Sequence, residues 1–427
     1  MARDERTRPA RRWAHGLDTG DGGDARDGFD DAASGRDRGS GEDRRRPLDV
    51  LAEARRMRLR LGAAIVVLLL AVGAAGYYAG GRPVAPGTGV YNAKTTNAVT
   101  AALPLLEAFV ERIRGQAFER PVRVEVVSGG VLARQRVAAL SVPTADRAAT
   151  ARALHLGKPA TPSLPAGTSA DAGGYYSFRT RVVYLASGPF DAYRRAVLVH
   201  ELTHALDDQR FDLRALSRAA APNADRLRAV QALIEGDAAR VEHTFTDGLS
   251  AADQATITAH QPPNATATTL AGNEAGFVAS PGQQFVLTVA QRGGEAAVDA
   301  AFLRPPDSSL QILLPQNYVS GVSALGVIAP TPSGTTVDQG SLGTFGLATF
   351  LTDGRSYLNA STTTHWQGDS YRTVTTGAKT CITDDVLLSS GPARDQLVTA
   401  LRTTIGKRGH VAATPPDDAL TFTSCSS

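Results

Sequence analysis

Two histidines and a glutamate, His200, Glu201 and His204, are spaced as H-E-x-x-H in an otherwise apolar stretch. Apolar residues recur at helical spacing from position 197 to 206, without proline or glycine, which predicts a helix. On a helix the two histidines share one face, a turn apart, so both imidazoles can bind one ion. Zinc accepts such nitrogen ligands at about 2.0–2.1 Å. Glu201 is rotated off the pair, where it can reach a metal-bound water and act as a general base without being a ligand.

The histidine pair needs a third protein ligand, because a catalytic zinc has three such ligands and one open position. One continuation, H-E-x-x-H-x-x-G-x-x-H, is excluded because Asp207 and Arg210 occupy its glycine and last histidine places. Within 232–239, Glu235 is an acid in an apolar helical stretch, where acids are rare without a partner. Glu235 is therefore the predicted third ligand.

Glu242 is the alternative third ligand, since it follows Glu235 by seven residues and lies on a similar helix face. Gly236 stands beside Glu235, although glycine costs a helix about 1 kcal/mol relative to alanine. We therefore expect another element to approach the helix closely at Gly236.

The elements around the motif follow from hydrophobic periodicity. Asp191 is the expected N-cap of the motif helix, which should end near Asp208. Short strands at 175–178 and 182–185 precede it and predict a hairpin. The edge of this hairpin either binds an extended peptide by main-chain pairing or is an ordinary hairpin edge.

Other helices and strands are expected along the whole globular region. Helices are predicted at 96–118, 145–156 and 223–247, with shorter helices over 250–302 that break at Pro262-Pro263 and at Ser280-Pro281-Gly282. Strands are predicted at 122–127, 371–374 and 380–383. The expected fold class is α+β and mainly helical.

The first eighty residues divide into a polar tail and an apolar run. Residues 1–54 are rich in Arg, Asp and Gly, which predicts a disordered tail. The run at 61–80 is long enough to cross a hydrocarbon core of about 30 Å, and Tyr77 and Tyr78 fit an interfacial aromatic belt. The arginines before it place the N-terminus in the cytoplasm. A cleaved signal peptide is the alternative to this single-pass anchor.

The remaining chain is then an extracytoplasmic domain. A linker at 82–95 leads into residues 96–427, with the zinc core at about 175–250 and a mixed region at about 354–427. The net charge of +3 is too small to indicate nucleic acid as a partner. Outside the cytoplasm, the two cysteines Cys381 and Cys425 either form one disulfide or remain two free thiols.

Several segments carry a family resemblance. His200–Ala205 followed by Ile234–Ala238 resembles the thermolysin-like gluzincin metallopeptidases, and is most similar to bacterial membrane-anchored members with a Pro-Pro-x-Ser and a Trp-x-Gly-Asp segment. Pro305–Leu313 and Trp366–Asp369 match those segments, and the resemblance covers about 175–371.

The resemblance implies a zincin-type domain that hydrolyses a peptide or protein substrate. It implies that His200, His204 and Glu235 bind Zn2+ and that Glu201 activates the water. The alternative is a non-catalytic zinc-binding surface protein with the same fold.

Two further roles of the family are open in this chain. Ala239 stands where the family often has an Asp that orients a zinc-bound histidine, so Asp207, Asp208 or Asp237 is expected to serve instead. The side chain that stabilises the oxyanion has three candidates by residue type: Tyr176, His365 and Tyr371.

Overall fold

The computed structural model describes residues 93–140, 145–156, 173–260, 270–356, 364–414 and 419–426. All of them belong to one compact unit, Ala85–Ser427. Helices and strands are mixed, as the α+β class predicts. The predicted tail at 1–54 and membrane segment at 61–80 lie outside the described residues. None of the described helices is long and apolar enough to cross a bilayer.

A small sheet precedes the motif helix. Its strands are β1 (Arg123–Val127), β3 (Val182–Ala186) and β2 (Gly174–Ser177), in the order β1-β3-β2. β2 and β3 form the predicted antiparallel hairpin, whereas β1 runs parallel to β3. Two helices accompany this sheet: α2 (Ala93–Arg114), which was predicted, and α3 (Gly129–Leu140), which was not.

The motif lies on α5 (Ala192–Phe211), which packs against α7 (Ala224–Asp247). Asp191 caps α5 as predicted, accepting a hydrogen bond from the Arg194 backbone N at 3.0 Å. A short helix, α6 (Leu213–Ala220), joins the two. The apolar side of α5 is buried against α2 and the small sheet, in a cluster that includes Leu198 and Leu202.

The helices after α7 differ from the prediction at one proline. α8 (Ala251–His260) is followed by α9 (Leu270–Leu303), which continues through Ser280-Pro281-Gly282. The predicted break there is wrong, since packing of α9 against α7 outweighs the hydrogen bond that a proline removes from a helix. The non-helical backbone lies instead at Gly293 and Gly294.

The crossing of α7 and α9 is closest at two glycines. A Cβ on Gly236 would lie 2.3 Å from the Gly282 carbonyl, and a Cβ on Gly282 would lie 2.3 Å from the Ala232 carbonyl oxygen. No side chain fits in that space. The close approach expected at Gly236 is therefore confirmed.

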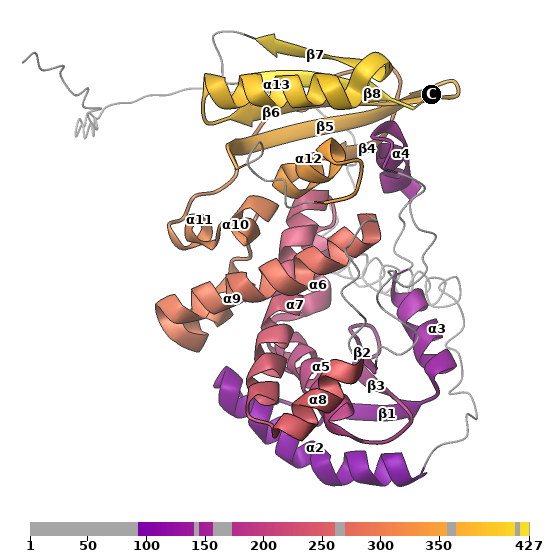
Figure 1. Cartoon of the computed structure of the whole chain (residues 1–427), viewed down its shortest axis with the longest axis vertical. Helices are drawn as coiled ribbons and strands as arrows, with labels where there is room; N and C mark the ends of the chain where they lie inside the picture. Colours follow the sequence, from indigo (N-terminus) through magenta and orange to yellow (C-terminus); the bar gives the residue numbers. More distant parts are fainter. Residues whose placement is uncertain are drawn as a thin grey trace, which may run out of the picture. The chain divides into compact units, whose positions relative to one another are not determined.

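The C-terminal part is built on a second sheet, antiparallel throughout, in the order β4-β5-β6-β8-β7 (Figure 1). Its strands are β4 (Thr335–Gly340), β5 (Trp366–Thr376), β6 (Lys379–Leu388), β7 (Gly409–Thr414) and β8 (Ala419–Cys425). The strands predicted at 371–374 and 380–383 are parts of β5 and β6. β4 begins before the boundary expected at 354. Helices α4 (Ala145–Ala153), α12 (Gly343–Leu351) and α13 (Gly391–Ile405) share one apolar core with the sheet.

The Trp366–Asp369 segment has a structural role. The buried carboxylate of Asp369 accepts hydrogen bonds from four donors: Trp366 Nε1, Ser341 Oγ, and the backbone N of Leu342 and Gly343, at 2.7–3.0 Å. These bonds attach the turn at the start of α12 to the first residues of β5.

The Pro305–Leu313 segment contributes a second link, through Ser309 at the start of α10 (Ser309–Leu313). Its backbone N donates to Asp225 Oδ2 at 2.8 Å, and its hydroxyl accepts from the backbone N of Phe345 at 3.0 Å. Ser309 thereby connects α7 to α12. Burial raises the pKa of Asp225 to about 7, although the nearby Arg228 opposes that shift.

The predicted disulfide is present between Cys381 and Cys425, which are directly opposed on β6 and β8. It closes a loop across 44 residues of sequence, which restricts the unfolded chain. Replacing both cysteines with alanine should therefore lower the free energy of unfolding by about 2–4 kcal/mol. Urea denaturation measures this, with each single variant expected to cost about as much as the double variant. Wild-type stability in the double variant would contradict the estimate.

Candidate metal centre

The three predicted ligands meet between α5 and α7. Glu235 Oε2 lies 3.5 Å from His200 Nε2 and 3.6 Å from His204 Nε2, and one ligand atom from each residue lies within 4.8 Å of the other two. Two atoms bound to zinc at about 2.0–2.1 Å with a tetrahedral angle are about 3.3–3.4 Å apart. The separations from the carboxylate oxygen thus fit one tetrahedral ion.

The charges in the centre favour a cation. Burial alone would lower the pKa of His200, but hydrogen bonds that the ring donates to the carboxylates of Glu235 and Glu242 outweigh it and raise that pKa well above its usual value. Burial would raise the pKa of Glu235, but His204 and His200 lower it far below the ordinary range. Glu235 is therefore ionised at neutral pH, as a metal ligand must be.

Glu242, the alternative ligand, has a different place. Its Oε2 lies 3.0 Å from His200 Nδ1, the nitrogen that faces away from Glu235. Glu242 reaches His200 from two helical turns beyond Glu235 and contacts the ring nitrogen that would not bind the ion. Glu242 is thus placed to orient His200, which Ala239 cannot do.

The three aspartates expected in that role bind elsewhere, so this expectation is corrected. Asp207 and Asp237 pair with Arg114, and Asp208 accepts hydrogen bonds from the Tyr176 hydroxyl and the Leu213 backbone N. His204 Nδ1 is buried and has no hydrogen-bond partner among the described residues.

Removing Glu242 should therefore weaken metal binding without removing a ligand. Orienting partners of this kind contribute 10–100-fold to metal affinity, so Glu242→Ala should raise the zinc dissociation constant by about that factor. Glu242→Gln, which retains an acceptor but loses the charge, should fall between wild type and Glu242→Ala. Competition with a chromophoric chelator measures both constants.

The adjacent residue provides the control for this prediction. His243 is 63% exposed and pairs with Asp247, so His243→Gln should bind zinc like the wild type. Equal affinities in Glu242→Ala and His243→Gln would show that Glu242 has no part in the centre.

Glu201 is held beside the centre by the edge strand β2. Its side chain is buried, and Oε2 accepts a hydrogen bond from the Tyr176 backbone N at 2.6 Å. The strand lies close to the helix because Gly174 has no side chain: a Cβ there would lie 2.7 Å from Val197 Cγ1 and 3.1 Å from Glu201 Cγ. The edge strand therefore fixes the orientation of the predicted base.

The oxyanion candidates have other hydrogen-bond partners. The Tyr176 hydroxyl donates to Asp208 at 2.9 Å, and the Tyr371 hydroxyl donates to Asp338 at 3.0 Å within the core of the C-terminal sheet. His365 Nδ1 lies 3.0 Å from Ser389 Oγ. None of the three side chains bonds to a metal-centre residue in the described part of the chain.

A buried ion cluster that the sequence analysis missed lies next to the centre. Arg114, at the end of α2, is fully buried and lies 2.7–3.2 Å from carboxylate oxygens of Asp207, Asp237, Glu295 and Asp299. Arg240 also binds Asp237 and Glu295, each at 2.8 Å. Asp207 follows His204 by three residues, and Asp237 follows Glu235 by two. The cluster thus joins α5 and α7, the two helices that carry the predicted ligands, to α2 and α9.

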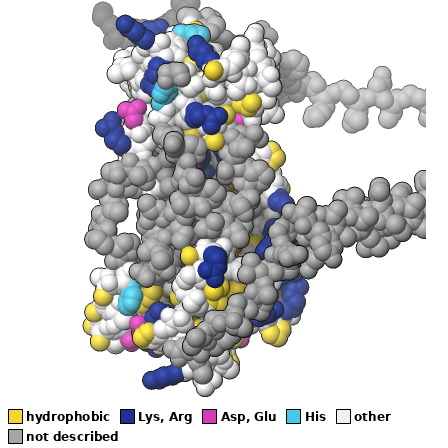
Figure 2. All heavy atoms as spheres, turned by 90° about the vertical axis from the view of Figure 1, so that its right-hand side faces the viewer, with side chains coloured by type: hydrophobic (Ala, Val, Ile, Leu, Met, Phe, Trp, Pro, Cys, Tyr) yellow, Lys and Arg dark blue, Asp and Glu magenta, His cyan; other side chains and the backbone are white. Residues whose placement is uncertain are grey.

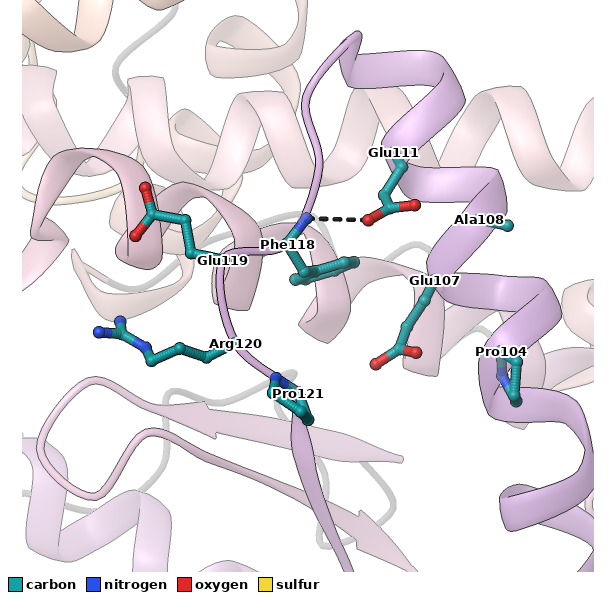
Figure 3. A pocket seen from close by; sticks show the side chains of 8 residues that line it. All are labelled: Pro104, Glu107, Ala108, Glu111, Phe118, Glu119, Arg120 and Pro121. Atoms are coloured by element: carbon teal, nitrogen blue, oxygen red, sulfur yellow. Dashed lines mark hydrogen bonds between the residues drawn. The ribbon is translucent and has the colours of Figure 1, made fainter.

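Other surface features lie apart from these residues. A cavity of about 350 Å³ beside α2 is lined by Glu107, Glu111 and Phe118 but by no metal-centre residue (Figure 3). Glu111 accepts a hydrogen bond from the Phe118 backbone N there, at 2.8 Å. On the face drawn in Figure 2, the visible Lys and Arg side chains are scattered among uncharged ones.

Comparison with protein-family models, curated proteins and solved structures returned no match to the chain.

Proposed function

We propose that the chain is a zinc-dependent metallopeptidase of the gluzincin type. The observation that carries this is the approach of Glu235 Oε2 to Nε2 of both motif histidines, at 3.5 and 3.6 Å. The proposal includes the predicted membrane anchor at 61–80 and an extracytoplasmic catalytic domain. Its substrate is a peptide or protein.

In this proposal His200, His204 and Glu235 hold the ion, and Glu201 moves the proton. When bound, zinc polarises the scissile carbonyl and lowers the pKa of its water to about 7. The Glu201 carboxylate accepts the proton of the attacking water and later donates it to the leaving amine nitrogen. The Tyr176 N–H holds the carboxylate in place for both transfers, and Glu242 orients His200.

The alternative, a non-catalytic zinc protein, loses one of its arguments. One ground for it is that Ala239 leaves no Asp to orient a zinc-bound histidine, but Glu242 lies 3.0 Å from His200 Nδ1. A purely structural zinc site is usually closed by a fourth protein ligand, whereas only one three-residue cluster is found among the described residues. Both observations favour the enzyme.

Removing the metal should abolish activity. We expect the full chain in detergent micelles to cleave unfolded casein, to lose this activity with 1,10-phenanthroline, and to regain it with equimolar zinc. The isomer 1,7-phenanthroline, which does not chelate, is the control. Cleavage that persists after the metal has been removed would exclude a metallopeptidase.

A further inference from the structure

A second cavity, of about 490 Å³, lies beside the N-terminus of α7. Asn223, the N-cap of α7, lines it together with the start of β5 and with residues 324–327 and Ala329. Glu235 follows Asn223 by twelve residues, which is roughly 18 Å along a helix. The cavity is therefore separate from the metal centre.

The cavity contains a positive charge that has no partner among the described residues. Arg372 of β5 lines it, and its guanidinium forms no hydrogen bond or ion pair with any described residue, although Nε is buried. Leaving a buried N–H donor such as Arg372 Nε unpaired is costly. The nearest acid along β5, Asp369, is already occupied by its four donors. An anion in the cavity would satisfy Arg372.

A carboxylate in the wall limits what kind of anion fits. Asp307 also lines the cavity, and its buried Oδ1 lacks a partner among the described residues. A carboxylate at the wall repels a polyanion but accepts an N–H donor. The ligand should therefore carry one negative group together with hydrogen-bond donors.

The wall of the cavity combines polar and apolar residues, and part of its backbone has no partner among the described residues. No charged residue occurs from 308 to 337. Six of the seven exposed large apolar side chains of the described residues lie between Leu303 and Ile328, and one of them, Leu325, lines the cavity. From Gly326 to Ala329, no backbone group bonds to any described residue. An extended chain can pair with such a segment.

We infer that this cavity is a peptide-binding site, at which Arg372 binds a carboxylate of an extended polypeptide. The planar guanidinium matches a carboxylate, and Asp307 and the free backbone of 326–329 match amide groups of the same ligand. The carboxylate is a C-terminus or an acidic side chain. Peptide binding at this cavity can be measured without hydrolysis, so the inference is tested separately from the proposed zinc chemistry.

Fluorescence anisotropy with three labelled probes tests the inference, using the full chain in detergent with Glu201→Gln to prevent cleavage. The first probe is an alternating Val-Ala hexapeptide with a free C-terminal carboxylate, and the second is its C-terminal amide. The third is the amide with one internal Glu. We expect the first or third probe to bind about tenfold or more tightly than the second, which also identifies the source of the carboxylate.

Arg372→Gln should remove that preference, weakening only the carboxylate probes by about tenfold. Arg402→Gln, at an exposed arginine of α13, is the matched control and should change nothing. Melting curves show whether Arg372→Gln is folded. If Arg372→Gln unfolds, the inference is tested by the chain that keeps Arg372, which should prefer the carboxylate probes over the amide. Equal affinity for all probes, or binding of phosphatidylglycerol vesicles in place of the peptides, would overturn the inference.

Discussion

Replacing Glu201 with Gln is expected to lower the rate of peptide hydrolysis by about 10²–10⁴-fold, the usual contribution of a general base. The amide cannot accept the proton of the attacking water. Its carbonyl oxygen can still accept the Tyr176 N–H, which lies 2.6 Å from Glu201 Oε2. We therefore expect the variant to fold and to bind zinc like the wild type. Parallel measurements of casein cleavage and zinc content separate these two effects.

The Glu201 prediction distinguishes the enzyme from the non-catalytic alternative. Glu274→Gln is the matched control, because Glu274 is 49% exposed and pairs with Arg228 away from the centre. It should cleave at the wild-type rate. Full activity in Glu201→Gln would refute the role of this residue, even if zinc were bound.

The second large effect is expected at Arg114. Arg114→Met should lower the free energy of unfolding by about 3–5 kcal/mol, since it leaves buried carboxylates without their cation. Asp207 is most affected: burial raises its pKa, and Arg114 is the group that opposes this. Asp207 lies on α5 and Asp237 on α7, the helices that carry the predicted ligands, so zinc affinity should fall as well. Urea denaturation and chelator competition measure the two quantities.

The control for Arg114→Met is the same substitution at an arginine that has no buried partners. Arg226 is exposed on α7, so Arg226→Met should change stability by less than about 0.5 kcal/mol. Similar stability in the two variants would show that the cluster around Arg114 is not needed for the fold.

Local signals in the sequence are sufficient for the elements that carry the centre. Helical periodicity and the capping residue Asp191 predict α5 within a few residues of its observed bounds, and α7 begins directly after Asn223. Alternation predicts the β2–β3 hairpin. Glu235 is predictable because an acid in an apolar helical stretch needs a partner, and the structure brings it to both histidines.

Contacts between distant segments are not contained in local patterns. Arg114 is an ordinary basic residue at a helix end, and only the packing of α2 against α5, α7 and α9 buries it. Glu242 lies on the same face of α7 as Glu235. It is two turns further along the helix, so its carboxylate contacts His200 Nδ1 and not the Nε2 atoms of the predicted ligands. At Pro281, packing against α7 outweighs the local tendency of proline to end a helix.

Zinc content of the full chain, for the wild type and for Glu235→Ala, tests the central claim most directly. After metal-replete purification and removal of loosely bound ions, we predict one zinc per wild-type chain and a loss of most of it in Glu235→Ala. No zinc in the wild type, or an unchanged content in the variant, would contradict a centre formed by His200, His204 and Glu235.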